Sequence, residues 1–437
     1  MSMVETTPLT SRWETLMRAL LRERSGEPVP VRAMREAAFA RFAELGFPTP
    51  SQEEWRLTPV QSITSSAWEL APKRAVADAA LDPWRIHDGA NAELVFVDGR
   101  FDAERSTAAS AKGLTFRPLA SALASPNGEL SALGRLAQDG LRPFVALNTA
   151  LMADGAVIDV ADRAAAGVVH LLFYSAGDSR VVSPRVLVRA GRGSQVTIIE
   201  THTGEGRYFT NAVTEVFGGE GSVIDHYKIV SESPEGYHVG AVEIRQERDC
   251  AVHSRLIGLG GPLTRTDLAT ALDGEGASCT LDGLYLLGGK EHFDAHTRIE
   301  HAKPHTDSLE LYKGVLAGSA RGVFNGLVIV RPDAQKITAR QTNKNLLMSN
   351  DAIADSNPQL EIHANDVKCN HGSTIGQLDA TSLFYLQSRG IGLEEAKGML
   401  TFAFAGEVID RMKVEPIRKR LEDALLVRLA DGSGRAS

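Results

Sequence analysis

The sequence predicts a mainly β protein with a parallel β-helix core and helical segments at both ends. Three observations predict this fold: glycine concentrates in the middle of the chain, short apolar strands recur there at a nearly constant spacing, and helical spacing of apolar residues is confined to the two ends. The chain has 437 residues, 43% of them hydrophobic and 23% charged, which is ordinary globular composition. At about 150 residues per domain, this length predicts two or three domains, or one large domain with appendages.

Glycine-rich turns mark the repeating part of the chain. More than half of the glycines lie between Gly191 and Val330, which is less than a third of the sequence. Turn-to-strand junctions recur in this part at positions 193, 221, 250 and 276. Their nearly constant spacing falls within the range of about 20 to 50 residues that is typical of solenoids and arrays.

The strands of this repeat alternate in polarity, as residues 277–282 illustrate. Ala277, Cys279 and Leu281 point to one side, and the polar residues between them point to the other. Since helices are nearly absent from the region, such strands can close a core as a sandwich, a barrel or a parallel β-helix. The irregular period, with a glycine and a small residue opening each unit, favours the β-helix, and a β-sandwich is the next alternative.

The N-terminal segment, residues 1–60, carries helical spacing. Trp13, Leu16 and Leu20 share one side of a first helix, and Gly46 ends a second one. Ser51, followed by two acidic residues, predicts a further helix start. Downstream, Leu-Val-Phe-Val-Asp-Gly at 94–99 reads as a strand entering a turn.

Helical spacing returns after Gly376. Asp379 can cap a helix that ends at Gly390, and Leu393 begins another. Pro416 opens a last amphipathic helix, before a frayed tail over 431–437. One face of that helix carries Ile417, Leu421, Leu425 and Leu429.

These patterns predict three domains. Residues 1–140 form a mostly helical N-terminal domain, and short strands from about Leu141 begin a β-helix core over 141–376. Residues 377–437 form a C-terminal helical domain.

Charge and cysteine content exclude several classes of protein. A net charge of −8 with interleaved acids and bases argues against a nucleic-acid-binding protein. Three cysteines cannot form a disulfide framework, which favours free thiols in the cytosol. The longest uncharged apolar stretch, Ala164 to Gly177, is too short to span a bilayer, and the N-terminus has neither an apolar secretory core nor a transit-peptide composition. We therefore expect a soluble, cytoplasmic protein.

The most pointed local feature is Lys368-Cys369-Asn370-His371. In an extended strand, residues two apart face the same side, about 6.6 Å apart, so the thiol and the imidazole would share a face. Such a pair suits a soft or borderline ion such as iron, copper or zinc, or a persulfide with imidazole beside it. The alternative is a buried cysteine that acts as a small hydrophobic residue beside a hydrogen-bonded histidine.

A second cluster places four histidines close together in the sequence, with two carboxylates among them. They lack the HExxH spacing of a zinc site, and two preceding glycines argue against a helix. We read them mainly as hydrogen-bonding residues of turns and strands, with a metal site as the alternative. The cluster consists of His292, His296, His301 and His305, with Asp294 and Glu300.

Common catalytic motifs are absent from the sequence. It contains no G-x-x-x-x-G-K-[ST] loop, no G-x-G-x-x-G between a strand and a helix, and no G-x-S-x-G elbow. The chain should therefore not hydrolyse ATP itself. Without a C-x-x-C or four cysteines, it cannot alone hold an all-thiolate iron–sulfur cluster.

Residues 357–391 carry a family resemblance. They include Asn-Pro-Gln-Leu-Glu-Ile-His-Ala-Asn-Asp-Val-Lys-Cys-Asn-His-Gly-Ser-Thr-Ile-Gly and Leu-Phe-Tyr-Leu-Gln-Ser-Arg-Gly-Ile, and strongly resemble the SufB/SufD family of iron–sulfur cluster assembly proteins. Gly372-Ser373-Thr374 after the Cys-x-His is similar to the SufD pattern rather than the SufB pattern. The likeness extends over nearly the whole chain, through Gly46-Phe-Pro-Thr-Pro, Glu54-Trp55-Arg56, Tyr312-Lys313-Gly314, Gly322-Val-Phe-Asn-Gly326, Ala334-Gln335 and Gln341-Thr-Asn-Lys-Asn-Leu346.

The resemblance implies a right-handed parallel β-helix between two helical domains, in a complex with a SufB-like subunit and a SufC-like ATPase that docks on the C-terminal helices. It implies that His371 contributes to a transient Fe–S cluster shared with the partner subunit, and that Cys369 matches the neighbouring family cysteine. The isolated chain is also a candidate homodimer.

We thus expect a scaffold subunit and not an enzyme. The enzyme alternative is a β-helix carbohydrate-active lyase or hydrolase, which needs an acid/base cluster on one strand face. A third alternative is a binding module without chemistry.

Overall fold

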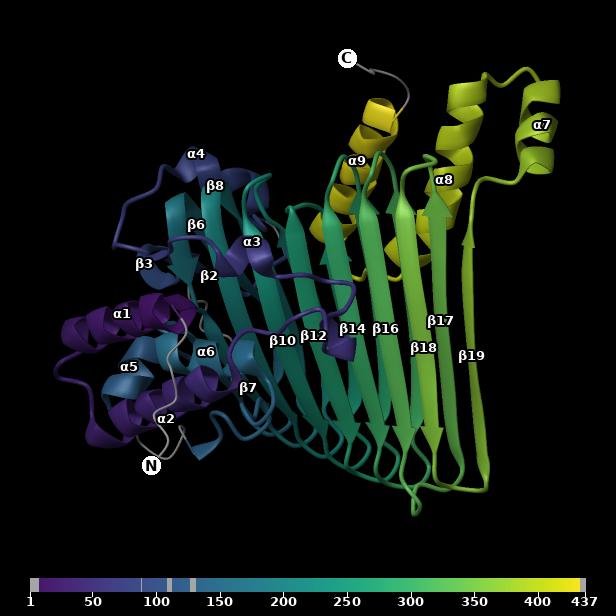
Figure 1. The fold of residues 1–437 in the computed structure, drawn as a ribbon. Coiled ribbons are helices and arrows are strands. Elements are labelled where there is room, and N and C mark those ends of the chain that lie inside the picture. The colour runs from purple at the N-terminus through teal and green to yellow at the C-terminus, as the bar shows by residue number, and fades with distance from the viewer. Residues whose placement is uncertain (1–7, 88, 108–111, 126–130, 433–437) are drawn as a thin grey trace.

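The computed structural model describes residues 8–87, 89–107, 112–125 and 131–432. They form a parallel β-solenoid of about eight turns with helices at both ends of the chain. Figure 1 shows the long, nearly parallel strands side by side, with the N-terminal helices at one end of the row and the C-terminal helices near the other. The predicted β-helix is confirmed and the alternative β-sandwich is not. The repeating strands pair in parallel, and each pairs with the next strand but one along the chain, as β11 does with β13 and β12 with β14.

The solenoid consists of two stacks of parallel strands that enclose the main core. The inward residues of both stacks, such as Val252 and Leu268, belong to one buried apolar cluster. Stack 1 contains β5 (Gly155–Val160), β7 (Arg185–Ala190), β8 (Gln195–Gly218), β10 (Tyr237–Gln246), β12 (Leu263–Leu272), β14 (His292–His301), β16 (Arg321–Val330) and β18 (Ile353–Ile362). Stack 2 contains β2 (Ala92–Val97), β6 (Ala165–Val182), the first half of β8, β9 (Val223–Ser231), β11 (Ala251–Gly258), β13 (Ser278–Leu287), β15 (Asp307–Leu316), β17 (Ile337–Leu347) and β19 (Val367–Gly376).

One corner of every coil is a residue in the left-handed backbone region. The N–H of most of these residues donates to a carbonyl of the next coil, as from Gly193 to Glu220 and from Gly221 to Arg248. The repeating position is Asp249, not Cys250 as the sequence spacing predicts, so the corners are spaced more evenly than expected. The corner residues are Arg163, Gly193, Gly221, Asp249, Gly276, His305 and Lys336, with φ between 54° and 75°.

The inward face is apolar for most of its length but carries polar side chains in register. Gln341 on β17 stacks on Glu310 of β15, and its Nε2 donates to Glu310 Oε2 at 2.7 Å. Burial raises the pKa of Glu310 to about 7, against a usual value of 4.5.

The N-terminal part is partly helical and partly continuous with the solenoid. Its helices are α1 (Pro8–Glu23), α2 (Val29–Leu45), α3 (Gln61–Thr64), α4 (Asp78–Leu81), α5 (Leu119–Ala124) and α6 (Pro143–Leu151), with 3₁₀ turns at Glu53–Trp55 and Asp82–Trp84. The helix expected after Ser51 is only such a turn. Three strands also lie outside the main stacks: β1 (Glu69–Leu70) beside β6, and β3 (Arg100–Thr107) and β4 (Leu114–Pro118), antiparallel to β2 and β5.

The predicted start of strands at about Leu141 is wrong. Residues 143–151 form α6, whose side chains are all buried. Phe144 of α6 packs with Trp55, at 5.3 Å between ring centroids, in a cluster that joins the N-terminal helices to the solenoid. The boundary near residue 140 is therefore not a break in packing, although the three-domain division stays a prediction.

The C-terminal helices are α7 (Ala380–Ser388), α8 (Leu393–Ile409) and α9 (Glu415–Gly432). Asp379 caps α7 as predicted, since its carboxylate accepts from the Ser382 N–H at 2.8 Å. Ile417, Leu421 and Leu425 of α9 are buried against the outer face of stack 2, whereas the side chain of Leu429 lies outside the described residues. Of the expected tail, 431 and 432 continue α9 and 433–437 lie outside the description. No helix of the described chain is long and apolar enough to cross a membrane.

We predict that Glu310→Gln changes the pH dependence of stability. The folded state holds the Glu310 proton up to about pH 7, whereas an ordinary glutamate loses it near 4.5, so the wild type loses stability as pH rises through this window. Glutamine stays neutral and can accept from Gln341. The free energy of unfolding of the variant, measured in urea, should gain roughly 3 kcal/mol relative to wild type between pH 5 and pH 8. Glu361→Gln, at an exposed position of β18, is the control, and a parallel shift of both variants would contradict the prediction.

Gly283→Ala should destabilise the solenoid. A Cβ at this position of β13 would lie 2.1 Å from the ring of the buried Tyr312 on β15. Overpacking of this kind costs about 1 to 3 kcal/mol, read as a lower urea midpoint. Gly376→Ala on β19 is the matched control, because a Cβ there meets nothing within 4 Å. Equal midpoints for the two variants would contradict the packing argument.

Candidate functional site

The predicted thiol–imidazole pair lies on β19, the last strand of the solenoid. Cys369 is in register with Ala339 of β17, and His371 is in register with Gln341. Cys369 packs against the main core, so the odd-numbered positions of this strand point into the solenoid. The expectation that Cys369 and His371 share one face of a strand where the β-helix gives way to helix is consistent with this placement.

His371 is exposed although it occupies an inward position. Gln341, its neighbour one coil below, is 1% exposed, and Glu310 below that is fully buried. The difference arises because β19 has β17 on one side and no further coil on the other. His371 therefore stands at the open end of the stack, accessible to a partner.

Cys369 is half-buried beside it. Burial raises the pKa of this thiol above its usual value, so in this chain alone it is predominantly protonated at neutral pH. A bound metal ion or a cationic group from a partner would favour the thiolate.

These two side chains form an incomplete ligand set. A tetrahedral metal site needs four ligands, or three with a solvent position. Within the described part of the chain, three metal-ligating side chains converge elsewhere, at His202, Glu232 and His238. Cys369 and His371 alone therefore supply two of the ligands that such a site needs.

The four-histidine cluster does not converge on a metal. His292 Nε2 lies 3.0 Å from Thr58 Oγ1, and His296 Nε2 lies 3.1 Å from Asp294 Oδ1. His301 is buried between Thr306 and Ser308, while His305 is a corner residue. The interpretation as hydrogen-bonding residues of turns and strands is confirmed for His292 and His301.

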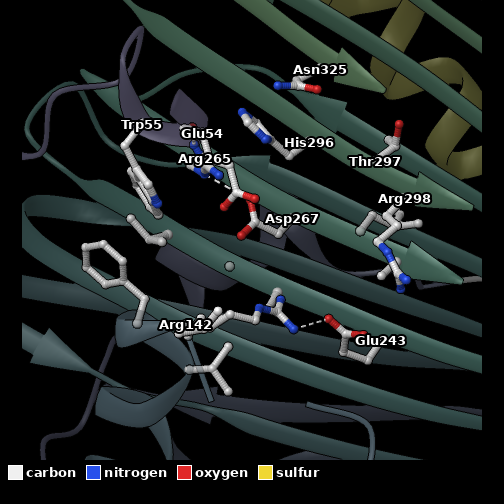
Figure 2. A pocket seen from close by; sticks show the side chains of 18 of the residues that line it. Glu54, Trp55, Arg142, Glu243, Arg265, Asp267, His296, Thr297, Arg298 and Asn325 are labelled. Atoms are coloured by element: carbon white, nitrogen blue, oxygen red, sulfur yellow. Dashed lines mark hydrogen bonds and ion pairs between the residues drawn. The ribbon is translucent and has the colours of Figure 1, made fainter. Parts of the chain in front are cut away.

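A cleft of about 500 Å³ lies where the 53–55 turn and α6 meet stack 1 (Figure 2). Two arginines that line it pair with carboxylates of the same lining. Arg142 forms an ion pair with Glu243. Arg265 Nε lies 2.9 Å from Asp267 Oδ1, and its guanidinium carbon lies 3.7 Å from the centroid of the Trp55 ring. These contacts attach the N-terminal segment to the sheet.

Sequence reasoning missed the group inside the solenoid. His202 lies on β8 and His238 on β10, Glu232 directly follows β9, and all three are fully or almost fully buried. The signal was the polar residues at alternate positions of otherwise apolar strands, beginning with Glu200 and His202.

Two family models cover most of the chain. The model for the SUF system FeS cluster assembly SufBD core domain matches residues 173–404. The model for the SufBD protein N-terminal region matches residues 16–167.

Curated relatives agree with these matches. An iron–sulfur cluster assembly SufBD family protein of Synechocystis is 30% identical over 408 residues, 90% of each chain. The iron–sulfur cluster assembly protein SufD of Escherichia coli is 30% identical over 399 residues, 89% of this chain and 90% of the relative. SufD of Bacillus subtilis is 27% identical over 64% of this chain and 65% of its own. With its parallel solenoid and its terminal Cys-x-His, the chain belongs to the SufB/SufD family of the SUF iron–sulfur cluster assembly system.

Proposed function

We propose that this chain is a non-catalytic scaffold subunit that pairs with a SufB-like subunit and a SufC-like ATPase to build and transfer nascent Fe–S clusters. The observation that carries the proposal is that β19, the terminal strand at the open end of the solenoid, carries both Cys369 and His371. The cluster is cargo, held only during assembly.

The open end supports pairing with a second solenoid. Among the described residues, β18 pairs in parallel only with β16 and β19 only with β17. Unpaired backbone groups at a sheet edge favour strand addition from another chain. The last two strands also expose large apolar side chains: Ile353 is 50% exposed, Ile362 42% and Ile375 47%. Exposed apolar surface beside unpaired strands is typical of a protein interface. In the absence of the partner, the same edge can pair with a second copy of this chain.

The ligand chemistry supports a shared cluster. Neutral imidazole and thiolate are both iron ligands, and replacing thiolate by histidine changes the reduction potential of a cluster. Two donors from this chain leave the other positions to the SufB-like partner. The site is therefore complete only in the complex.

The C-terminal helices support ATPase docking. α7 has no buried side chain, and its Phe384 and Tyr385 are 73% and 57% exposed. α8, in contrast, is fixed to the solenoid, since Lys313 of β15 lies 2.5 Å from Glu407. This arrangement presents an apolar helix on a rigid support (Figure 1).

The carbohydrate-active alternative requires two free carboxyl groups that flank a sugar. On the strands that line the cleft, Glu243 and Asp267 are each paired with an arginine. The other two glutamates of the lining, Glu53 and Glu54, are neighbours in one turn and not on opposite sides. The cleft therefore favours the scaffold.

We expect His371→Ala to impair cluster formation while leaving the complex intact. The imidazole lies at the open end and contributes to no core, so its loss removes a ligand without unfolding the solenoid. Cluster content of the co-purified complex, read from iron and the charge-transfer absorption, should fall by about tenfold or more. Cys369→Ser should have a smaller effect, since the family resemblance places the main sulfur-bearing cysteine on the partner.

Asn370→Ala is the matched control, because Asn370 lies between the two residues and points away from the core. Full cluster content and full maturation of client enzymes in cells carrying His371→Ala would exclude the ligand role.

Replacement of Phe384 and Tyr385 by serine should weaken ATPase binding. Loss of an aromatic interface anchor costs about 2 kcal/mol, which corresponds to roughly 30-fold in Kd. Binding is measured by calorimetry or pull-down of the SufC-like partner.

A double serine variant at Val29 and Leu141, which are 81% and 84% exposed and lie far from the C-terminal helices in the sequence, is the control. If both double variants bind the ATPase equally well, α7 is not the docking helix.

A further inference from the structure

A column of inward polar side chains leads from the open end into the solenoid. It runs from His371 on β19 through Gln341 on β17 to Glu310 on β15, and each residue is in register with the next. The His371 side chain is exposed, whereas Gln341 and Glu310 are buried. Strands that pair in a sheet lie about 4.8 Å apart, so each side chain of the column can reach the one above and the one below.

The carboxamide of Gln341 is held from below. Its Nε2 donates to Glu310 Oε2 at 2.7 Å. The opposite stack closes on the same nitrogen, since a Cβ on Gly326 of β16 would lie 2.3 Å from it. Because the oxygen and the nitrogen of a planar carboxamide diverge, Oε1 is directed away from Glu310.

The Oε1 atom of Gln341 is a buried acceptor that receives no hydrogen bond from the described residues. Other polar groups nearby are satisfied. Asn343 Nδ2 donates to the Tyr312 carbonyl at 3.2 Å, and the Ser373 hydroxyl donates to Ser356 Oγ at 2.8 Å. Since a buried carbonyl oxygen without a donor is unfavourable, this position favours an N–H group in the coil above.

His371 is the side chain in that coil. Its ring makes no hydrogen bond with the described residues, so it is free to turn toward Gln341. A neutral imidazole has one N–H and one nitrogen lone pair, on different sides of the ring. When the N–H points down the column, the lone pair points out of the open end. A metal-binding histidine usually donates its second ring N–H to an oxygen acceptor in this way.

We propose that Gln341 is a positioning residue for His371. Its Oε1 accepts the N–H of one ring nitrogen, which directs the lone pair of the other nitrogen toward the iron of a nascent cluster. Glu310 keeps the carboxamide in the required orientation, and neither Gln341 nor Glu310 contacts iron. Only the last step, from the oriented ring to iron, rests on the proposed function.

The hydrogen bond is tested in the isolated, metal-free full chain with ¹⁵N-labelled histidine. Ring nitrogen shifts report the tautomer ratio of His371 at pH 8.5, where an ordinary histidine is neutral, and His371→Ala assigns the signals. Gln341→Met keeps the length of the side chain but removes the carbonyl acceptor. It should change the ratio by about fivefold, which corresponds to one ordinary hydrogen bond. Glu310→Met, which frees the carboxamide to turn, should change the ratio in the same direction.

Glu310→Gln is the matched control, because glutamine retains an acceptor for Gln341 Nε2 and should leave the ratio unchanged. An unchanged ratio in folded Gln341→Met, judged by circular dichroism, overturns the proposal. Wild type supplies a test that does not depend on the variants. If its His371 tautomer ratio is the same in the folded chain and in guanidinium chloride, the proposal is also overturned.

The complex with the SufB-like and SufC-like partners separates this inference from the proposed function. There, Gln341→Met should weaken retention of the cluster against a chelator by about tenfold while the subunits stay together. Full cluster content in His371→Ala contradicts the proposed function and leaves the tautomer result standing. Loss of the cluster in His371→Ala, together with tautomer ratios that do not respond to Gln341→Met, overturns only the role of Gln341.

Discussion

The structure depends on one constraint: in a parallel solenoid, the backbone of each coil is hydrogen-bonded by the coils before and after it. The left-handed corner residues extend this dependence to the turns, since most of the corner N–H groups donate to the following coil. The last strand, β19, has β17 on one side only. The end of the repeat is therefore an unpaired edge, and the fold itself determines where a partner chain can be added.

The same constraint explains why His371 is accessible. An inward side chain is buried in every coil that is covered by another, as Gln341 and Glu310 in the same column are. At the terminal coil the same position opens to solvent, so polar residues there cost nothing in desolvation. Deeper in the solenoid the cost is met by pairing, as where Glu200 contacts Lys228 and His226. Inward positions therefore carry a solvent-exposed His371 at the terminal coil and a buried, paired Glu200 inside the solenoid.

Much of this architecture could be predicted from the sequence, because strand period and glycine turns are local signals. The terminal position of Cys369 and His371 followed from the helical spacing that begins after Gly376. The helix α6 could not be predicted, since a short apolar run does not distinguish helix from strand by periodicity. Corner residues such as Asp249 could not be located from the glycine pattern, because a non-glycine residue can also adopt positive φ. The buried group of His202, Glu232 and His238 could not be predicted, because it depends on the register between coils, which no local sequence pattern contains.

Ion pairs fix α8 and the segment after it, which follow the exposed α7, to the body of the solenoid. Beyond the contact of Glu407 with Lys313, Arg411 lies 2.7 Å from Asp282 of β13, and Lys413 lies 3.0 Å from Asp225 of β9. These anchors are spread over several coils and reinforced by the buried face of α9. α7 therefore extends from a C-terminal segment that is fixed to the outer face of stack 2 at several coils.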